Sequence, residues 1–220
     1  KWMYLQPSPN KFNFGAADKY VELGKKNNMH IVGHALVWHN QLADFMKTTV
    51  SPDEFTNHVE NHINTVVSRY KGEIHAWDVV NEAFNEDGSL RPSVFKKQMG
   101  DNYIEDVFKL AETADPDADL IYNDYNLYKP AKLAGVLKMV KRLQANGTKI
   151  NAIGAQAHWR LNSPSLNEIE QIILDISELG VEVMFTELDI TVLPNPWELV
   201  GAEVTQNFSK FEGDPKMDPY

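Results

Sequence analysis

The sequence contains no cysteine among its 220 residues, so neither disulfide bonds nor thiolate metal ligands can stabilise the fold. Long apolar runs are also missing, whereas a membrane-spanning helix needs about 20 consecutive apolar residues. We therefore expect no membrane partner. Hydrophobic residues make up 43% and charged residues 24% of the chain, which is ordinary for a globular domain with its own core.

Positive charge is scarce relative to negative charge. There are 21 lysines and arginines against 31 aspartates and glutamates, which gives a formal net charge of −10. A chain with this charge is repelled by polyanions, so we expect no nucleic-acid partner. A neutral polymer is compatible with this charge.

Three signatures of other enzyme classes are absent. No glycine-rich phosphate-binding turn follows an apolar run, which weakens a nucleotide-binding interpretation. No Gly-x-Ser-x-Gly turn offers a serine nucleophile. No His-x-His pair follows a strand, and His34 and His39 are placed on opposite faces if the strand continues between them, which weakens a metal-dependent hydrolase.

What the sequence does contain is an alternation of strand and helix patterns. Short apolar runs rich in β-branched residues predict buried parallel strands at 31–37, 74–80, 119–122, 150–155 and 181–185. Helical patterns lie at 16–27, 51–70, 103–114, 130–145 and 165–179, and two of them open with capping boxes, Ser51 with Glu54 and Ser165 with Glu168. Repeated β-α units form either an open doubly wound sheet or a closed (β/α)8 barrel, and the spacing alone does not decide between them.

Polar side chains gather where the predicted strands end. In parallel α/β folds this edge of the sheet is where ligands bind. The five strand ends carry amides, carboxylates, imidazoles and aromatic rings: His34, Trp38, His39 and Gln41; Asn81 and Glu82; Asn123, Asp124, Tyr125 and Asn126; Gln156, His158 and Trp159; Glu187 and Asp189.

Two glutamates on separate strands suit the cleavage of a glycosidic bond. One carboxyl group protonates the leaving oxygen, while the other attacks the anomeric carbon or activates water. Tryptophan and tyrosine faces can stack on sugar rings, and amides can bind sugar hydroxyls. Trp77 is predicted to lie in the core, and Asp78 is predicted either to support the site or to form a buried salt bridge.

Five motifs in order along the chain closely resemble glycoside hydrolase family 10, the barrel-type xylanases. They are GHALVWHNQ at 33–41, WDVVNE at 77–82, YNDYN at 122–126, GAQAHW at 154–159 and TELD at 186–189. The resemblance implies a (β/α)8 TIM barrel and endo-cleavage of β-1,4-xylan with retention of configuration. By this resemblance Glu82 is the acid/base and Glu187 is the nucleophile, with no metal or other cofactor.

The resemblance also implies roles for the residues around the two glutamates. Asn81 is expected to bind the sugar 2-hydroxyl, Tyr125 to be the aglycone-side aromatic, and His158 to orient the nucleophile with Asp189 as its partner. Gln156 would lie beside them. The remaining expected substrate contacts form the walls of the glycone subsite: Lys1, His34, Trp38 and Gln41.

Relative to that family, the chain is expected to supply only strands three to seven of eight. The first two strands would precede Lys1 and the eighth would follow the loop at 194–220. We therefore expect residues 1–220 to form a single catalytic barrel domain that is truncated at both ends, with the rest of the barrel coming from additional polypeptide.

Two other functions stay open at this point. A retaining β-1,4-glucanase acting on cellulose or mixed-linkage glucan is the nearest alternative. A non-catalytic glycan-binding fragment would keep the aromatic rings and amides. The presence of both glutamates favours an enzyme. The expected partners are xylan and xylo-oligosaccharides, and the polymeric substrate implies a secreted or periplasmic location.

Overall fold

A five-stranded parallel sheet lies at the centre of the computed structural model, which describes residues 1–49 and 51–191. The strand order is β1-β2-β3-β4-β6, and every pairing is parallel. The strands are β1 (Val32–Trp38), β2 (Ala76–Asn81), β3 (Asp119–Asp124), β4 (Ala152–Ala155) and β6 (Glu182–Phe185). All five predicted strands are confirmed, with ends that differ from the predicted ones by at most two residues.

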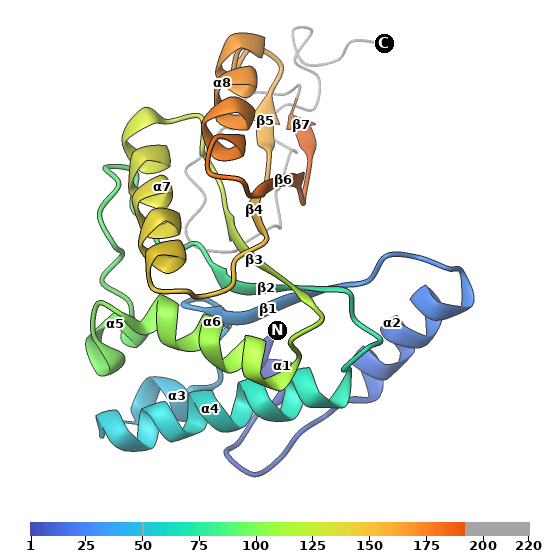
Figure 1. The fold of residues 1–220 in the computed structure, drawn as a ribbon. Helices are drawn as coiled ribbons and strands as arrows, with labels where there is room; N and C mark the ends of the chain where they lie inside the picture. The colour runs from blue at the N-terminus through green and yellow to red at the C-terminus, as the bar shows by residue number, and fades with distance from the viewer. Residues whose placement is uncertain (50, 192–220) are drawn as a thin grey trace, which may run out of the picture.

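The long helices connect these strands and cover the sheet from outside. Figure 1 shows α4, α6, α7 and α8 along the outer side of the curved sheet. The five predicted helices are present as α2 (Gly15–Lys26), α4 (Pro52–Arg69), α6 (Tyr103–Ala114), α7 (Pro130–Ala145) and α8 (Leu166–Ser177).

Five short elements were not predicted. Three are helices, α1 (Trp2–Leu5), α3 (Asp44–Thr48) and α5 (Val94–Met99), and two form a separate parallel pair, β5 (His158–Arg160) with β7 (Asp189–Thr191). Segments this short show no apolar periodicity that a sequence pattern could reveal.

The predicted capping box at α4 is only half confirmed. The Ser51 side chain accepts a hydrogen bond from the Glu54 N–H, but the Glu54 carboxylate lies 3.7 Å from His58 Nε2, on the next turn. At α8 both halves form, because the Glu168 carboxylate also accepts from the Ser165 N–H at 2.7 Å. Glu54 and Glu168 thus belong to helix starts, as expected.

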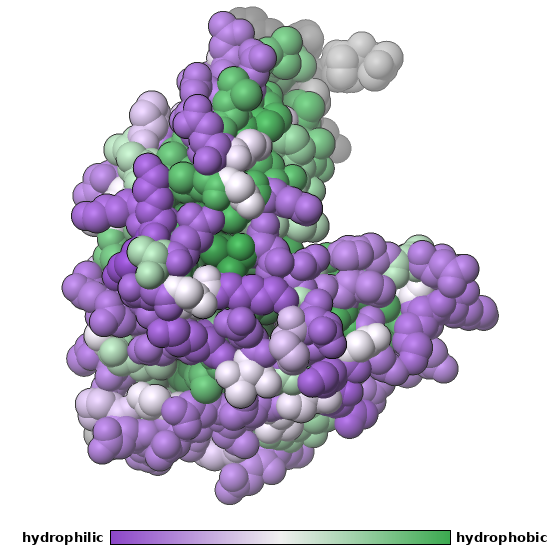
Figure 2. All heavy atoms as spheres, viewed as in Figure 1, coloured by the Kyte–Doolittle hydropathy of each residue, from purple (hydrophilic) through white to green (hydrophobic). Residues whose placement is uncertain are grey.

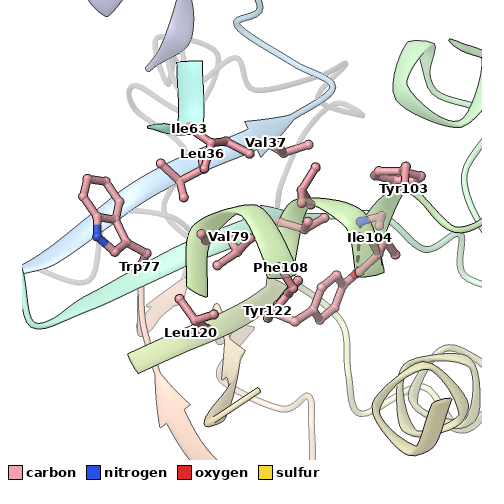
Figure 3. Close-up of a cluster of buried hydrophobic side chains, with 14 of the residues drawn as sticks. Leu36, Val37, Ile63, Trp77, Val79, Tyr103, Ile104, Phe108, Leu120 and Tyr122 are labelled. Atoms are coloured by element: carbon pink, nitrogen blue, oxygen red, sulfur yellow. Dashed lines mark hydrogen bonds between the residues drawn. The ribbon is translucent and has the colours of Figure 1, made fainter. Parts of the chain in front are cut away.

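The two faces of the sheet bury different side chains. On the outer face, Val79, Leu120 and Tyr122 of the strands lie toward Ile104 and Phe108 of α6 (Figure 3). The inner face carries a smaller cluster with one residue from each strand: Val32, Ala76, Ile121, Ala152 and Met184. Inward-pointing side chains from the strands fill the interior of α/β barrels.

Apolar side chains remain exposed around the end of the sheet that contains β6. Figure 2 shows hydrophobic residues gathered in the upper part of the molecule, where α8 and β5–β7 lie, above a mostly hydrophilic lower part. Within the described residues, β1 and β6 each pair with a strand on one side only. The exposed large side chains in this part are Leu161, Leu166, Ile173, Leu174, Phe185, Leu188 and Ile190.

Two further predictions concern the loop near the end of the chain and membrane-spanning segments. The loop predicted at 194–220 lies outside the described residues. No helix in the described part of the chain is long and apolar enough to cross a membrane.

We predict that Gly154→Ala destabilises the fold by about 1–3 kcal/mol, as overpacking of a tight site does. A Cβ at this position in β4 would lie 2.4 Å from Asn123 Oδ1 and 3.0 Å from Thr186 Cγ2. Gly15→Ala is the matched control, because nothing lies within 4 Å of its Cβ. Urea unfolding of both variants measures the difference, and equal stabilities would contradict this account of Gly154.

Candidate active site

The ends of the strands bring the two predicted catalytic glutamates to one edge of the sheet. Glu82 directly follows β2, and Glu187 follows β6 by two residues. Their backbones are tied to neighbouring strand ends, because the Glu82 N–H donates to the Asn123 carbonyl at 2.9 Å and the Glu187 N–H donates to the Gln156 carbonyl at 3.1 Å. Both carboxylates therefore lie at the same level of the sheet.

Three buried side-chain amides link the two carboxylates. Gln156 Nε2 donates to Glu82 Oε1 and to Asn81 Oδ1, each at 3.1 Å. Asn123 Nδ2 donates to the same Asn81 oxygen at 3.0 Å and to Glu187 Oε1 at 3.1 Å. Asn81, Asn123 and Gln156 are each no more than 3% exposed, so this hydrogen-bond chain is shielded from water and holds both carboxylates in fixed positions.

Two further donors orient the Glu82 carboxylate. Trp38 Nε1 donates to Glu82 Oε2 at 2.9 Å, and Asn81 Nδ2 donates to Glu82 Oε1 at 3.2 Å. The backbone of Glu82 has φ = 58°, in the left-handed region. A left-handed backbone conformation costs a residue other than glycine roughly 1–3 kcal/mol. Such a conformation persists where surrounding contacts enforce it.

The Glu187 carboxylate has a cationic partner. His158 Nε2 lies 3.3 Å from Glu187 Oε2, and His158 Nδ1 lies 3.0 Å from Asp189 Oδ2. The small β5–β7 sheet sets this arrangement, since His158 and Asp189 are register partners in it. The hydrogen bond to Glu187, with a smaller contribution from Asp189, raises the pKa of His158 to about 9. In return, the His158 hydrogen bond lowers the pKa of Glu187 and favours its ionised form.

A second imidazole lies on the other side of the site. His34 lies within β1 rather than at its end, where the sequence placed it. Its Nδ1 lies 2.8 Å from Oδ2 of the buried Asp78, a contact that fits both predicted roles of Asp78, support of the site and a buried salt bridge. Burial raises the pKa of the Asp78 carboxyl, while the bond with His34 opposes this shift. The charge of His34 also contributes, after the His158 bond, to the lowered pKa of Glu187.

Three other predicted substrate-binding residues, Lys1, Gln41 and Tyr125, have defined contacts in the structure. Lys1 Nζ lies 4.5 Å from the centroid of the Trp38 ring, and burial lowers the pKa of Lys1 against the opposing charges of Glu187 and Glu82. The Tyr125 hydroxyl accepts a hydrogen bond from Arg91 at 3.0 Å. Gln41 contributes its carbonyl, which accepts from the Met3 N–H at 3.1 Å and fixes α1 against the end of β1. The roles of these residues in sugar binding stay predictions.

The structure adds residues that the sequence-based list of site residues did not contain. Asn123 was recognised only as a polar residue at a strand end, and its bridging position between Asn81 and Glu187 depends on the strand register. Arg91 lies in none of the five sequence motifs, yet its Nε donates to the Glu82 carbonyl at 3.0 Å. Trp77 is 4% exposed and lies in the core, as predicted.

Comparison with known proteins assigns this arrangement to a family. The sequence profile of Glycosyl hydrolase family 10 matches residues 1–212. This chain belongs to that family. Endo-1,4-beta-xylanase A of Xylanibacter ruminicola is 41% identical over 221 residues, which cover 98% of this chain and 59% of that protein. Beta-1,4-xylanase of Dictyoglomus thermophilum is 42% identical over 87% of this chain and 55% of its own length.

Solved family 10 structures have the same fold as the described chain. A GH10 endoxylanase retrieved from a sugarcane soil metagenome superimposes with a TM-score of 0.87 at 43% identity, covering 94% of this chain and 62% of that one. Xylanase 10B from Thermotoga petrophila RKU-1, solved in complex with xylobiose, gives a TM-score of 0.84 at 40% identity over 86% of this chain and 59% of that chain. The predicted TIM-barrel fold is thereby confirmed, and the chain spans less than two thirds of the length of these relatives.

We predict that Asp189→Asn lowers the pKa of His158 from about 9 toward its ordinary value of 6.5, because one of the two carboxylates facing the imidazole is lost. NMR titration of the His158 ring, assigned by the signal missing in His158→Gln, measures this pKa. Asp44→Asn is the control, since the Asp44 side chain is 94% exposed and pairs with Lys47 outside the site.

The same pKa shift makes a prediction about stability. Because the fold raises the His158 pKa, the stabilisation from its protonated form is complete below a pH of about 6.5 and is lost as the pH rises through about 9. The difference in the free energy of unfolding between wild type and His158→Gln should shrink over this interval. A constant difference, or a wild-type His158 that titrates near 6.5, would refute the ion pair.

Proposed function

We propose that this chain carries the catalytic residues of a retaining endo-1,4-β-xylanase acting on xylan and xylo-oligosaccharides. The observation that carries the proposal is the buried amide chain joining Glu82 to Glu187, with the His158 imidazole 3.3 Å from Glu187. Retaining glycosidases require two carboxyl groups of this kind, one that exchanges a proton and one that attacks as a carboxylate. The xylanase names of the relatives and the xylobiose complex of one of them support the choice of substrate.

In the first step, Glu187 attacks the anomeric carbon. Its oxygen forms a glycosyl ester while the bond to the leaving sugar breaks, and the protonated Glu82 transfers its proton to the departing oxygen. His158 keeps Glu187 ionised before the attack, since the imidazolium favours the carboxylate. Asn81, fixed by Gln156 and Asn123, is positioned to bind the 2-hydroxyl of the same sugar, a contact that strengthens in the transition state.

In the second step, the Glu82 carboxylate takes a proton from water. The water oxygen attacks the anomeric carbon and breaks the ester to Glu187, which leaves as a carboxylate. Two inversions give net retention of configuration. Trp38 and Gln156 bind separate oxygens of Glu82, so the carboxyl group keeps its orientation while it changes protonation state.

The substrate class is tested with the full-length protein that contains this chain. We expect reducing sugar to be released from xylan and little from carboxymethyl-cellulose, with the β-anomer as the first product seen by NMR. A higher initial rate on carboxymethyl-cellulose would identify a glucanase. Binding of xylan in an affinity gel without release of reducing sugar would identify a non-catalytic glycan-binding protein.

The two carboxyl roles are tested with aryl xylobiosides. Glu82→Ala should nearly abolish xylan cleavage, a loss of about 10²–10⁴-fold, yet keep glycosylation by a xylobioside with a good leaving group, which needs no acid. Added azide should restore turnover and give the β-azide. Glu187→Ala should be inactive on both substrates. The reverse pattern would exchange the two roles.

A further inference from the structure

Arg91 lies outside the family motifs noted in the sequence, yet its side chain bonds three groups around Glu82. Its Nε donates to the Glu82 carbonyl at 3.0 Å, and its Nη2 donates to the Phe84 carbonyl at 3.2 Å and to the Tyr125 hydroxyl at 3.0 Å. Its own N–H donates to the Ala83 carbonyl at 2.7 Å. One half-buried guanidinium therefore joins the segment that follows β2 to the segment that follows β3.

The backbone that Arg91 holds is the one that aims the Glu82 carboxyl group. Glu82 has a left-handed backbone, and its peptide groups on both sides are bonded, the N–H to the Asn123 carbonyl and the carbonyl to Arg91. The next N–H, of Ala83, donates to the Tyr122 hydroxyl at 3.0 Å. Because a left-handed backbone needs contacts that enforce it, removing the Arg91 bonds weakens the restraint on Glu82 and allows its carboxyl group to shift from this orientation.

The third group bonded to Arg91 is the ring expected on the aglycone side. Lys132 Nζ lies 3.6 Å from the centroid of the Tyr125 ring. Lys132 is fully buried, and its ammonium lies 2.9 Å from the buried Asp124 carboxylate. Lys132 thus contacts the face of the Tyr125 ring, and Arg91 bonds its hydroxyl. Because Arg91 also bonds the Glu82 carbonyl, the position of the ring is coupled to the backbone of Glu82.

We propose that Arg91 is a positioning residue that couples the Tyr125 ring to the orientation of the Glu82 acid. The inference rests on the proposed function, since it assumes that Glu82 protonates a leaving group. A misaligned acid slows reactions in proportion to how much proton donation they need. Loss of Arg91 should therefore hardly affect substrates with good leaving groups and should slow those with poor leaving groups.

The test is a series of aryl β-xylobiosides whose leaving groups differ in pKa, measured with the full-length protein. For Arg91→Met we expect kcat/KM to fall about 10- to 100-fold for the poorest leaving group and less than about 3-fold for dinitrophenolate. A plot of log(kcat/KM) against leaving-group pKa then becomes steeper. A purely structural or binding role would lower all substrates in parallel and leave the slope unchanged, which would overturn the proposal.

Two arginine variants control for charge and for loss of an arginine. Arg91→Lys keeps the charge, but one ammonium does not reproduce the planar fork that reaches two carbonyls and a hydroxyl, so the slope should remain steep. A wild-type slope in Arg91→Lys would show that charge alone matters. Arg69→Met is the matched control, because Arg69 is exposed at the end of α4 and bonds Asp18, and we expect no change of slope.

Tyr125→Phe tests the coupling without removing the arginine. It deletes only the hydroxyl bonded to Arg91 and should steepen the slope less than Arg91→Met does. The double variant should be no slower than Arg91→Met alone, because both substitutions break the same connection. Losses that multiply in the double variant would overturn the link to Tyr125.

A wild type that cleaves neither xylan nor any aryl xylobioside refutes the proposed function itself. An active wild type with parallel losses refutes only the role of Arg91.

Discussion

The parallel register of the five central strands is the constraint on which the whole site depends. Trp38 pairs with Asn81, and Asn81 pairs with Asn123, so the indole and the two amides stand at one level. The ladder continues beyond the strands, since Gln156 donates its backbone N–H to Asp124 and Glu187 donates its own to Gln156. A shift by one residue in any strand would turn its polar side chain to the opposite face and break the amide chain between the carboxylates.

The two glutamates share this chain but differ in their remaining partners. Glu82 is bonded by neutral donors, the Trp38 indole and the amides of Asn81 and Gln156. Glu187 instead lies against an imidazole that Asp189 helps to keep protonated. The same residue type thus lies in two different environments, which is what the two proposed roles require. A fixed positive charge suits a group that must remain a carboxylate until it attacks, and neutral donors suit a group that gains and loses a proton in each cycle.

The sequence predicted the repeated elements well because buried strands and amphipathic helices leave periodic patterns. It also placed both glutamates at the correct edge, since strand ends can be recognised locally. It did not reveal β5 and β7, which are three residues each, and so the pairing of His158 with Asp189 came only from resemblance to a family. Arg91 and Asn123 were missed as site residues because their importance lies in partners distant in sequence, and the register that joins them is a property of the folded sheet.

The wide sequence separation within the amide chain has a consequence for how the protein folds. Gln156 reaches Glu82 across 74 positions, and Asn123 reaches Glu187 across 64. Contacts between residues this far apart in the sequence cost more loop-closure entropy than local contacts do, which slows their formation. Helices and the β1–β3 ladder can form while Glu187 is still undocked. The link between Glu82 and Glu187 is therefore complete only when β2, β3, β4 and β6 are all paired, and a chain in which β6 has not joined β4 lacks the site even if its other strands and helices have formed.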